Sequence, residues 1–424
     1  MNHIYRIATP LLFLLFLSCL DKNVPPVVVT VDGNSLRSNE FFSTINRKEF
    51  FKLKRSIRRK KIMDFVYTYL ADKEARKNKI TLSNEDLNLV ETKKNQLYID
   101  VLARQIILPK LLDDDITNKI MESLKKERFV SEIVVFHKFS FGHVNERTPL
   151  EAKKLSHIII NRLQSNNITF DEGVSIYTSL PPLKLKNGIV GFLPYGSYPK
   201  NYCDAIWNAP KDTIIGPIET NYGYHIVKIG DSRDAKTSFT IDEVNQDIIN
   251  GDYGVFDETM EGFASDLRNK QNCNIDTIAV IDLYNKLELI STHKKMIFSD
   301  LSKVVYNQPI GSCDNEDLSL AWFIEKGHQH GQINSASIHA PIALLKNLGD
   351  ILNRHLSVQW VKENNNINKL HIYQKVAFIE SEMLKKAYIK SELEKSTELI
   401  ESNVFNRLLL DREVLISEDF LNQN

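Results

Sequence analysis

The spacing of apolar residues along the chain predicts helices toward both of its ends. Between residues 61 and 79, apolar side chains return every three or four positions, which is typical of a helix with one buried face. This stripe consists of Ile62, Phe65, Val66, Tyr69 and Leu70. A run of β-favouring residues, Val27–Val31, and a turn at Asp32-Gly33 precede the helix. Helical spacing returns after residue 238, and residues 284–424 read as mainly helical.

Residues 131–234 show a different pattern, in which strands and helices alternate. The segment SEIVVFHKFSFG, which begins at Ser131, reads as a strand. A helix should follow, because Thr148 can cap it, Pro149 suits its first turn and Glu151 completes a capping box. The stretches after it read as a short helix, a turn-rich segment, a brief helix and a hairpin. This order predicts a compact α+β unit of about 100 residues.

The composition excludes several classes of function. Lysine plus arginine and aspartate plus glutamate both number 54, so the chain carries no net charge that would attract nucleic acid. Its 424 residues allow roughly two to four domains, and only 16 glycines disfavour an all-β architecture. The sequence has no phosphate-binding loop, no dinucleotide-binding glycine pattern and no Gly-x-Ser-x-Gly motif.

The N-terminus resembles a bacterial lipoprotein leader. After Arg6, the apolar run Leu11–Leu17 is too short for a permanent membrane span but suits a secretory signal. The run ends at Ser18-Cys19, a small residue before a cysteine, although Phe16 stands where such sites usually carry leucine. We therefore expect Cys19 to be acylated and to anchor the chain to a membrane. The alternative is plain secretion with cleavage elsewhere.

The remaining cysteines and the histidine-rich stretch indicate no metal site. The other three cysteines are Cys203, Cys273 and Cys313. They are widely spaced without a CxxC pair, so neither a zinc site nor a disulfide framework can be read, and their odd number leaves at least one free or paired with another chain. His328, His330 and nearby His339 lack a surrounding set of cysteines or carboxylates, so we expect a surface loop there instead of a metal site.

Several spaced residues in the 131–234 segment resemble the parvulin family of peptidyl-prolyl isomerases. The stretch NGIVGFLPYGSY carries the family's Gly-x-x-Gly-aromatic turn at Gly188 and Gly191. The residues after it follow the family pattern without a gap and close on Gly-Tyr-His-Ile, from Gly223 to Ile226. His137 matches the histidine on the family's first strand. The helical flanks resemble those of exported foldase-chaperones of the SurA and PrsA type.

The resemblance implies an α+β fold in which a parvulin-like domain, a four-stranded antiparallel sheet with surrounding helices, is inserted between mainly α-helical chaperone-like segments. The implied division is a lipoprotein-type signal peptide over 1–19, an N-terminal helical segment over 20–130, the isomerase domain over 131–234, a helical return segment over 235–283 and a mainly helical C-terminal domain over 284–424. It also implies a place in the cell envelope, facing the periplasm or the exterior. The implied partners are unfolded or proline-containing exported polypeptides. No cofactor is expected, because rotation about an X–Pro bond breaks no covalent bond.

The resemblance also assigns roles to individual residues. The expected catalytic residues are His137, His225, Ser179 and Thr220, and the expected proline-binding residues are Leu193, Tyr198 and Tyr202. The two histidines would lie on adjacent strands and hydrogen-bond one another. Two alternatives stay open: the tyrosines pack at the rim of a degraded pocket, and Ser179 and Thr220 are ordinary turn or cap hydroxyls.

One departure from the family pattern bears on activity. Pro181 stands where the family usually places a cysteine or aspartate facing the substrate carbonyl, and proline supplies neither group. Two functions therefore remain open from sequence: an exported peptidyl-prolyl isomerase that assists folding, and a weak or inactive parvulin-fold chaperone that binds unfolded polypeptide. A third alternative makes residues 284–424 the main partner-binding domain.

Overall fold

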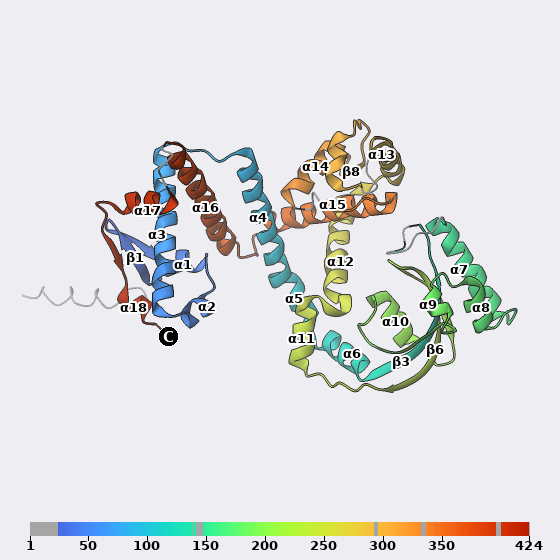
Figure 1. The fold of residues 1–424 in the computed structure, drawn as a ribbon. Coiled ribbons are helices and arrows are strands. Elements are labelled where there is room, and N and C mark those ends of the chain that lie inside the picture. Colours follow the sequence, from blue (N-terminus) through green and yellow to red (C-terminus); the bar gives the residue numbers. More distant parts are fainter. Residues whose placement is uncertain are drawn as a thin grey trace, which may run out of the picture. The chain divides into compact units, whose positions relative to one another are not determined.

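The structure is a computed structural model that describes residues 24–138, 140, 147–291, 296–331, 336–395 and 400–423 (Figure 1). The chain divides into two compact units, one formed by residues 1–94 and 368–424 and the other by residues 95–367. The predicted leader and Cys19 lie outside the described residues. The predicted boundaries at residues 131, 235 and 284 remain predictions, since the two units divide the chain at other positions.

The first unit joins segments from both ends of the chain in one antiparallel sheet. Its strand order is β10–β1–β2, with β1 (Val27–Val31), β2 (Asn34–Arg37) and β10 (Val414–Ile416). Val29 pairs with Leu36 on one side and with Ile416 on the other. The helices of this unit are α1 (Ser38–Phe42), α2 (Arg47–Lys52), α3 (Arg55–Lys77), α16 (Leu370–Glu394), α17 (Glu401–Leu409) and α18 (Glu418–Leu421).

The core of the first unit is rich in aromatic rings. Phe41, Phe50 and Phe420 are almost completely buried, and the rings of Phe41 and Phe50 meet edge to face at 5.0 Å. The predicted stripe of α3 faces this core, with Ile62, Val66 and Leu70 fully buried.

The second unit contains the predicted four-stranded antiparallel sheet. Its order is β4–β3–β6–β5, with β3 (Lys126–Val135), β4 (Ile189–Pro194), β5 (Ile214–Thr220) and β6 (Gly223–Asp234). Helices α7 (Pro149–Gln164) and α8 (Phe170–Tyr177) pack on one face, and α10 (Lys200–Asn208) packs on the other (Figure 1). The short helix α9 (Pro181–Lys184) precedes β4. The α+β fold class is confirmed.

Alternation of side chains along the central strands gives each face its own core. Ile133 and Val135 on β3 join Ile226 on β6 beneath α7 and α8. Val130 joins Val227 beneath α10 on the opposite face. The predicted start of α7 is also present, because the Thr148 hydroxyl accepts a hydrogen bond from the Glu151 amide and Glu151 bonds back to the Thr148 amide.

The rest of the second unit is largely helical. Its helices are α4 (Asn84–Leu102), which begins among residues of the first unit, then η1 (Ala103–Ile107), α5 (Leu108–Leu111), α6 (Asp114–Leu124), α11 (Ile241–Asn250), η2 (Asp252–Gly254), α12 (Val255–Lys270), α13 (Thr277–Ile290), η3 (Phe298–Lys303), α14 (Leu320–Gln329) and α15 (Pro341–Glu363). A small sheet of order β7–β8–β9 joins Asn274–Ile275, Gly311–Cys313 and Glu316–Leu318. Among the described residues, no helix is both long enough and apolar enough to cross a bilayer.

One feature of this region could not be read from the sequence, and one expectation about it was wrong. Cys273 and Cys313 form a disulfide, although no pairing could be read from their spacing. The pairing of Asn274 with Ser312 brings them together across 40 residues of sequence, while Cys203 is free and buried. The Gly-His-Gln-His stretch is not a surface loop, because His328 lies on α14 and His330, at the end of that helix, is 6% exposed.

Candidate active site

His225 lies at the centre of the four-stranded sheet with both ring nitrogens engaged. It sits on β6, opposite Val134 on β3 and Ile218 on β5, and is 3% exposed. Its Nδ1 lies 2.9 Å from the Glu132 Oε2, and its Nε2 lies 2.8 Å from the Thr220 Oγ1. The imidazole is therefore fixed by one residue from each neighbouring strand.

A connected set of hydrogen bonds extends from this imidazole across the sheet. The Tyr202 hydroxyl donates to the Glu132 Oε2 over 2.9 Å, and the Tyr222 amide donates to the Thr220 Oγ1 over 3.0 Å. With the proton of His225 on Nδ1, each group has a consistent role: Thr220 donates to Nε2, and the imidazole and Tyr202 both donate to Glu132. A buried polar network stabilises its site when every member has a partner.

Glu132 is the residue that sequence reasoning missed. It lies on β3, is 4% exposed, and takes the place next to His225 that was expected for His137. The available signal was the position of Glu132, an acid directly before the apolar run Ile133–Phe136 on the same strand. A carboxylate at an inward strand position needs buried partners, and that requirement indicates a polar site.

The expected hydrogen-bonded pair of His137 and His225 was wrong. His137 follows the end of β3, and its ring meets the edge of Tyr224, which belongs to the α7–α8 face of the sheet. Side chains alternate along a strand, so an odd number of residues after Val134 places His137 on the face opposite His225. His137 is buried, and burial lowers the pKa of its imidazole while Glu219 acts in the opposite direction.

Ser179 and Thr220 have different positions. Thr220 ends β5 and contacts the imidazole of His225 directly. Ser179 instead continues the pairing of β3: its hydroxyl accepts from the Phe136 amide over 3.2 Å, and its amide donates to the Val134 carbonyl over 2.7 Å. Whether either hydroxyl acts in catalysis stays a prediction.

The three expected proline-binding residues lie in one apolar cluster beneath α10. Leu193, Tyr198 and Tyr202 pack with Val130 and Val227. The tyrosine rings are stacked with centroids 4.7 Å apart, and the Tyr202 ring meets the His225 ring edge-on at 5.2 Å. Tyr202 is fully buried, whereas Tyr198 is half-buried. The cluster is therefore filled by its own rings around Tyr202.

Burial changes the acidity of these phenols. It raises the pKa of Tyr198 to about 12, with a smaller contribution from the Glu132 carboxylate. Burial also raises the pKa of Tyr202, followed by the charge of Glu132 and the hydrogen bond to it. Both hydroxyls therefore stay protonated at neutral pH, and Tyr202 acts as a donor. Pro181, at the start of α9, is exposed.

Two glycines explain why the chain can close around His225. Gly216 has φ +127°, and a Cβ there would lie 2.6 Å from the His225 carbonyl oxygen. Gly223 has φ +126°, and a Cβ there would lie 2.6 Å from the Val135 carbonyl oxygen. Both positions need glycine for conformation and for space. Within the described part of the chain, no group of three or more histidine, cysteine, aspartate or glutamate residues is arranged to hold a metal ion.

The sheet order, the helices on both faces and the buried histidine on a central strand match the arrangement that the resemblance to the parvulin family implies. The comparisons with known proteins agree. The family model of the PPIC-type PPIASE (Rotamase) domain matches residues 137–231. The chain thus contains a PpiC-type, parvulin domain within a SurA/PrsA-like arrangement.

Two curated relatives indicate how far the similarity extends. The chain is 34% identical over 107 residues to the chaperone SurA of Shewanella frigidimarina, covering 23% of this chain and 24% of the relative. It is 25% identical over 271 residues to the foldase protein PrsA of Halalkalibacterium halodurans, covering 55% of this chain and 78% of the relative. The match thus spans about a quarter of the first and about three quarters of the second.

A solved structure is also similar. The peptidylprolyl isomerase PrsA from Bacillus cereus covers 56% of this chain and 92% of its own, at 17% identity and a TM-score of 0.25.

Proposed function

We propose that the chain is an exported foldase whose parvulin-type domain isomerises X–Pro bonds in unfolded polypeptides. The observation that carries the proposal is the buried network of His225, Glu132 and Thr220 beneath the cluster of Leu193 and Tyr198. The similarity to a chaperone, SurA, and to a foldase, PrsA, supports the same function.

The chemistry requires little of the protein. Rotation about the X–Pro bond crosses a barrier of about 18–20 kcal/mol, and no nucleophile or metal is needed. The site must hold the proline ring in an apolar place and favour the twisted amide over the planar one. In this proposal, the proline ring packs against Leu193 and Tyr202, with Tyr198 displaced beside it. Thr220, His225 and Glu132 form a rigid polar floor that needs no reorganisation during the rotation.

Isomerase activity of the full chain on a proline-containing peptide tests this proposal. Leu193→Ala removes part of the proposed apolar wall and should lower kcat/KM. Leu185→Ala is a matched control, because Leu185 is 88% exposed in the same domain. Equal rates for the wild type and Leu193→Ala, with Leu185→Ala unchanged, would refute catalysis at this site.

A membrane anchor and a place in the cell envelope, facing the periplasm or the exterior, form part of the proposal. They are supported by the apolar run Leu11–Leu17 before Cys19 and by the kind of relatives that the chain resembles. Metabolic labelling with a clickable fatty acid should label the wild type and not Cys19→Ser. Label retained on Cys19→Ser would exclude acylation at this cysteine.

A second function is favoured by one specific observation. Tyr202 is fully buried, and its hydroxyl is bonded to Glu132, so the cluster is filled without a substrate. Together with Pro181, this supports a parvulin-fold chaperone that binds unfolded chains and isomerises weakly or not at all. Suppression of client aggregation by a protein with no measurable isomerase rate would select this function.

A further inference from the structure

A cavity lies at the other end of the central strands from His225. It has a volume of about 350 Å³ and is lined by residues that include Leu124, Glu127 and Phe239. Glu127 precedes Glu132 by five positions on β3, which corresponds to about 17 Å along an extended strand. The volume is within the range of pockets that hold small ligands or single side chains.

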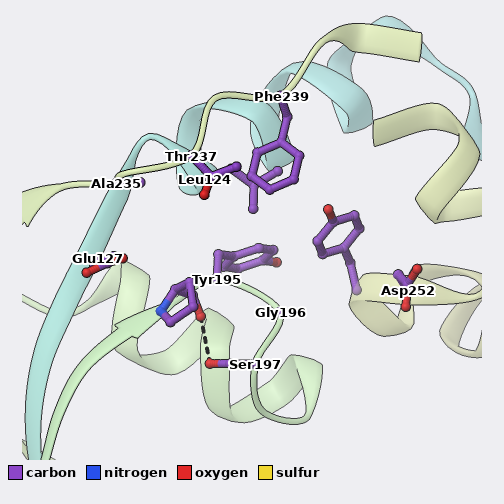
Figure 2. Close-up of a pocket in the computed structure, with 11 residues that line it drawn as sticks. Leu124, Glu127, Tyr195, Gly196, Ser197, Ala235, Thr237, Phe239 and Asp252 are labelled. Carbon is purple, nitrogen blue, oxygen red and sulfur yellow. Dashed lines mark hydrogen bonds between the residues drawn. The ribbon is translucent and has the colours of Figure 1, made fainter. Parts of the chain in front are cut away.

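Aromatic rings form much of the wall. Tyr195 and Tyr253 both line the cavity, with stacked rings whose centroids lie 6.2 Å apart. Figure 2 shows the Phe239 ring directed toward the Tyr195 ring from a different segment of the chain. The Tyr195 hydroxyl donates to Asp204 over 2.8 Å, and the Tyr253 hydroxyl donates to Asp247 over 2.9 Å. Both hydroxyls are thus committed, and the rings contribute their aromatic surfaces.

The backbone holds Tyr253 in an unfavourable conformation at this wall. Its φ of +60° lies in the left-handed region, which a non-glycine residue adopts at a cost of about 1–2 kcal/mol. Gly251, two residues before Tyr253, and Gly254, directly after it, also have positive φ. Across the cavity, a Cβ at Gly196 would lie 2.7 Å from the Tyr253 ring, so glycine allows the close approach. Such strain persists where a side chain must occupy a fixed place.

The charge of the lining has one sign. Its two charged residues are Glu127 and Asp252, both carboxylates. Glu127 is paired with Arg233 at 2.6 Å, whereas Asp252 is exposed. Lys200 packs beside Gly254 but is held at 2.5 Å by Asp204 and at 2.9 Å by Glu258. The lining therefore offers aromatic faces and a carboxylate without a cation of its own.

We propose that this cavity binds a lysine or arginine side chain of an extended client polypeptide. A cation within about 6 Å of an aromatic face is attracted by the ring quadrupole, and Tyr195, Tyr253 and Phe239 supply such faces. The carboxylate of Asp252 adds charge complementarity, and the long aliphatic stem of the basic side chain fits against Leu124. The proposal rests on the proposed function only in taking unfolded polypeptide as the source of the cation.

The geometry also relates this cavity to the proline site. Residues 193–202 serve both, because Leu193, Tyr198 and Tyr202 belong to the cluster beneath α10 while Tyr195 lines the cavity. Leu193 pairs with Arg128 on β3, and the next pair, Pro194 and Glu127, lines the cavity. A client with a basic residue near a proline can therefore occupy both places at once.

Fluorescence anisotropy with the full chain and labelled ten-residue peptides tests the inference. The peptides carry proline and, at two to six positions away, lysine, norleucine or glutamate. The lysine peptide should bind at least about threefold more tightly than the norleucine peptide, and the glutamate peptide should bind most weakly. Equal binding of the lysine and norleucine peptides overturns the proposal.

Variants test whether this cavity is the source of the preference for the lysine peptide. Asp252→Asn and Tyr253→Gly should each reduce the ratio of lysine-peptide to norleucine-peptide affinity toward one. Tyr253→Gly also relieves the left-handed strain at this position, so the fold should be retained, and a melting curve verifies this. Asp242→Asn removes an exposed carboxylate outside the cavity and should keep the preference. A preference that survives both cavity variants overturns the proposal.

The same preparations separate this inference from the proposed function. A preference for the lysine peptide without isomerase activity supports the cation site and refutes the proposed enzymatic function. Isomerase activity without a preference for the lysine peptide supports the enzymatic function and refutes the cation site.

Discussion

Two buried histidines in the helical part of the second unit should make its stability depend on pH. His330 is 6% exposed, and neither of its ring nitrogens has a hydrogen-bond partner among the described residues. Its ring lies 5.8 Å from that of His355 on α15. Burial, followed by the charges of His355 and Arg354, lowers the pKa of His330 to about 3, and burial lowers the pKa of His355 to about 4.

The direction of the effect follows from these pKa values. In the unfolded chain each imidazole titrates near 6.5, so protons bind the unfolded chain first as the pH falls. The neutral imidazoles stabilise the fold fully above pH 6.5, and that contribution is lost as the pH falls from there toward the folded values. At pH 5, one and a half units below 6.5, the loss is about 2 kcal/mol for His330. His355 contributes a similar amount, because its imidazole also stays neutral in the folded chain at pH 5.

Urea unfolding at pH 7.5 and pH 5.0 measures this loss. The chain has three tryptophans, and in a Trp207→Phe background the remaining two, Trp322 and Trp360, report on the core that contains α14 and α15. His330→Leu cannot be protonated, so it should lose about 2 kcal/mol less than the parent between the two pH values. His157→Gln, a change at an exposed position on α7, should behave like the parent. Equal losses for His330→Leu and the parent would refute the reasoning.

Three further predictions concern single contacts. Glu132→Leu leaves His225 and Tyr202 without their shared acceptor and should lower the free energy of unfolding by about 2–5 kcal/mol. Tyr202→Phe removes only one donor and should lower it by about 0.5–1.5 kcal/mol. Urea titrations that give the reverse order would contradict the hydrogen-bond network. Gly216→Ala should destabilise the sheet by more than about 1 kcal/mol, while Gly262→Ala, in open space on α12, should stabilise by up to about 1 kcal/mol, as thermal melts would measure. Cys273→Ser opens a loop of 40 residues and should cost about 4 kcal/mol on the chain-entropy estimate; an unchanged Trp322 and Trp360 unfolding midpoint would argue against it.

Local signals in the sequence predicted more than long-range ones did. The start of α7 was readable because Thr148 and Glu151 satisfy amides within one turn. Individual strands were readable because period-two patterns and turn glycines are also local, whereas the four-stranded sheet was implied by the resemblance to the parvulin family. The pairing of Val29 with Ile416 and the bond between Cys273 and Cys313 depend on which distant segments meet, and no short pattern encodes that choice.

In the candidate site, too, the locally encoded features were predicted correctly and the long-range contact was not. The strand of His225 and the turn before it were correctly placed, because Gly223 and the residues around it form a compact motif. The partner was misassigned because the choice between Glu132 and His137 depends on the register of β3 against β6, and an odd shift along a strand moves a side chain to the opposite face. His137 was assigned because it matched the histidine on the parvulin family's first strand, and Glu132 was not considered.

The hydrogen bonds around Glu132 determine how a proline ring could enter the cluster beneath α10. Moving Tyr202 outward would leave the Glu132 oxygen without one of its two donors in a fully buried place, which costs about 1–3 kcal/mol before any substrate contact forms. Tyr198 is half-buried and stacks on the outer side of that ring. Displacing Tyr198 costs one aromatic contact of about 0.5–1.5 kcal/mol, and the incoming proline ring replaces the contact with Tyr202. Entry by displacement of Tyr198, over a fixed Tyr202, is therefore the less costly route for either a catalytic or a purely binding site.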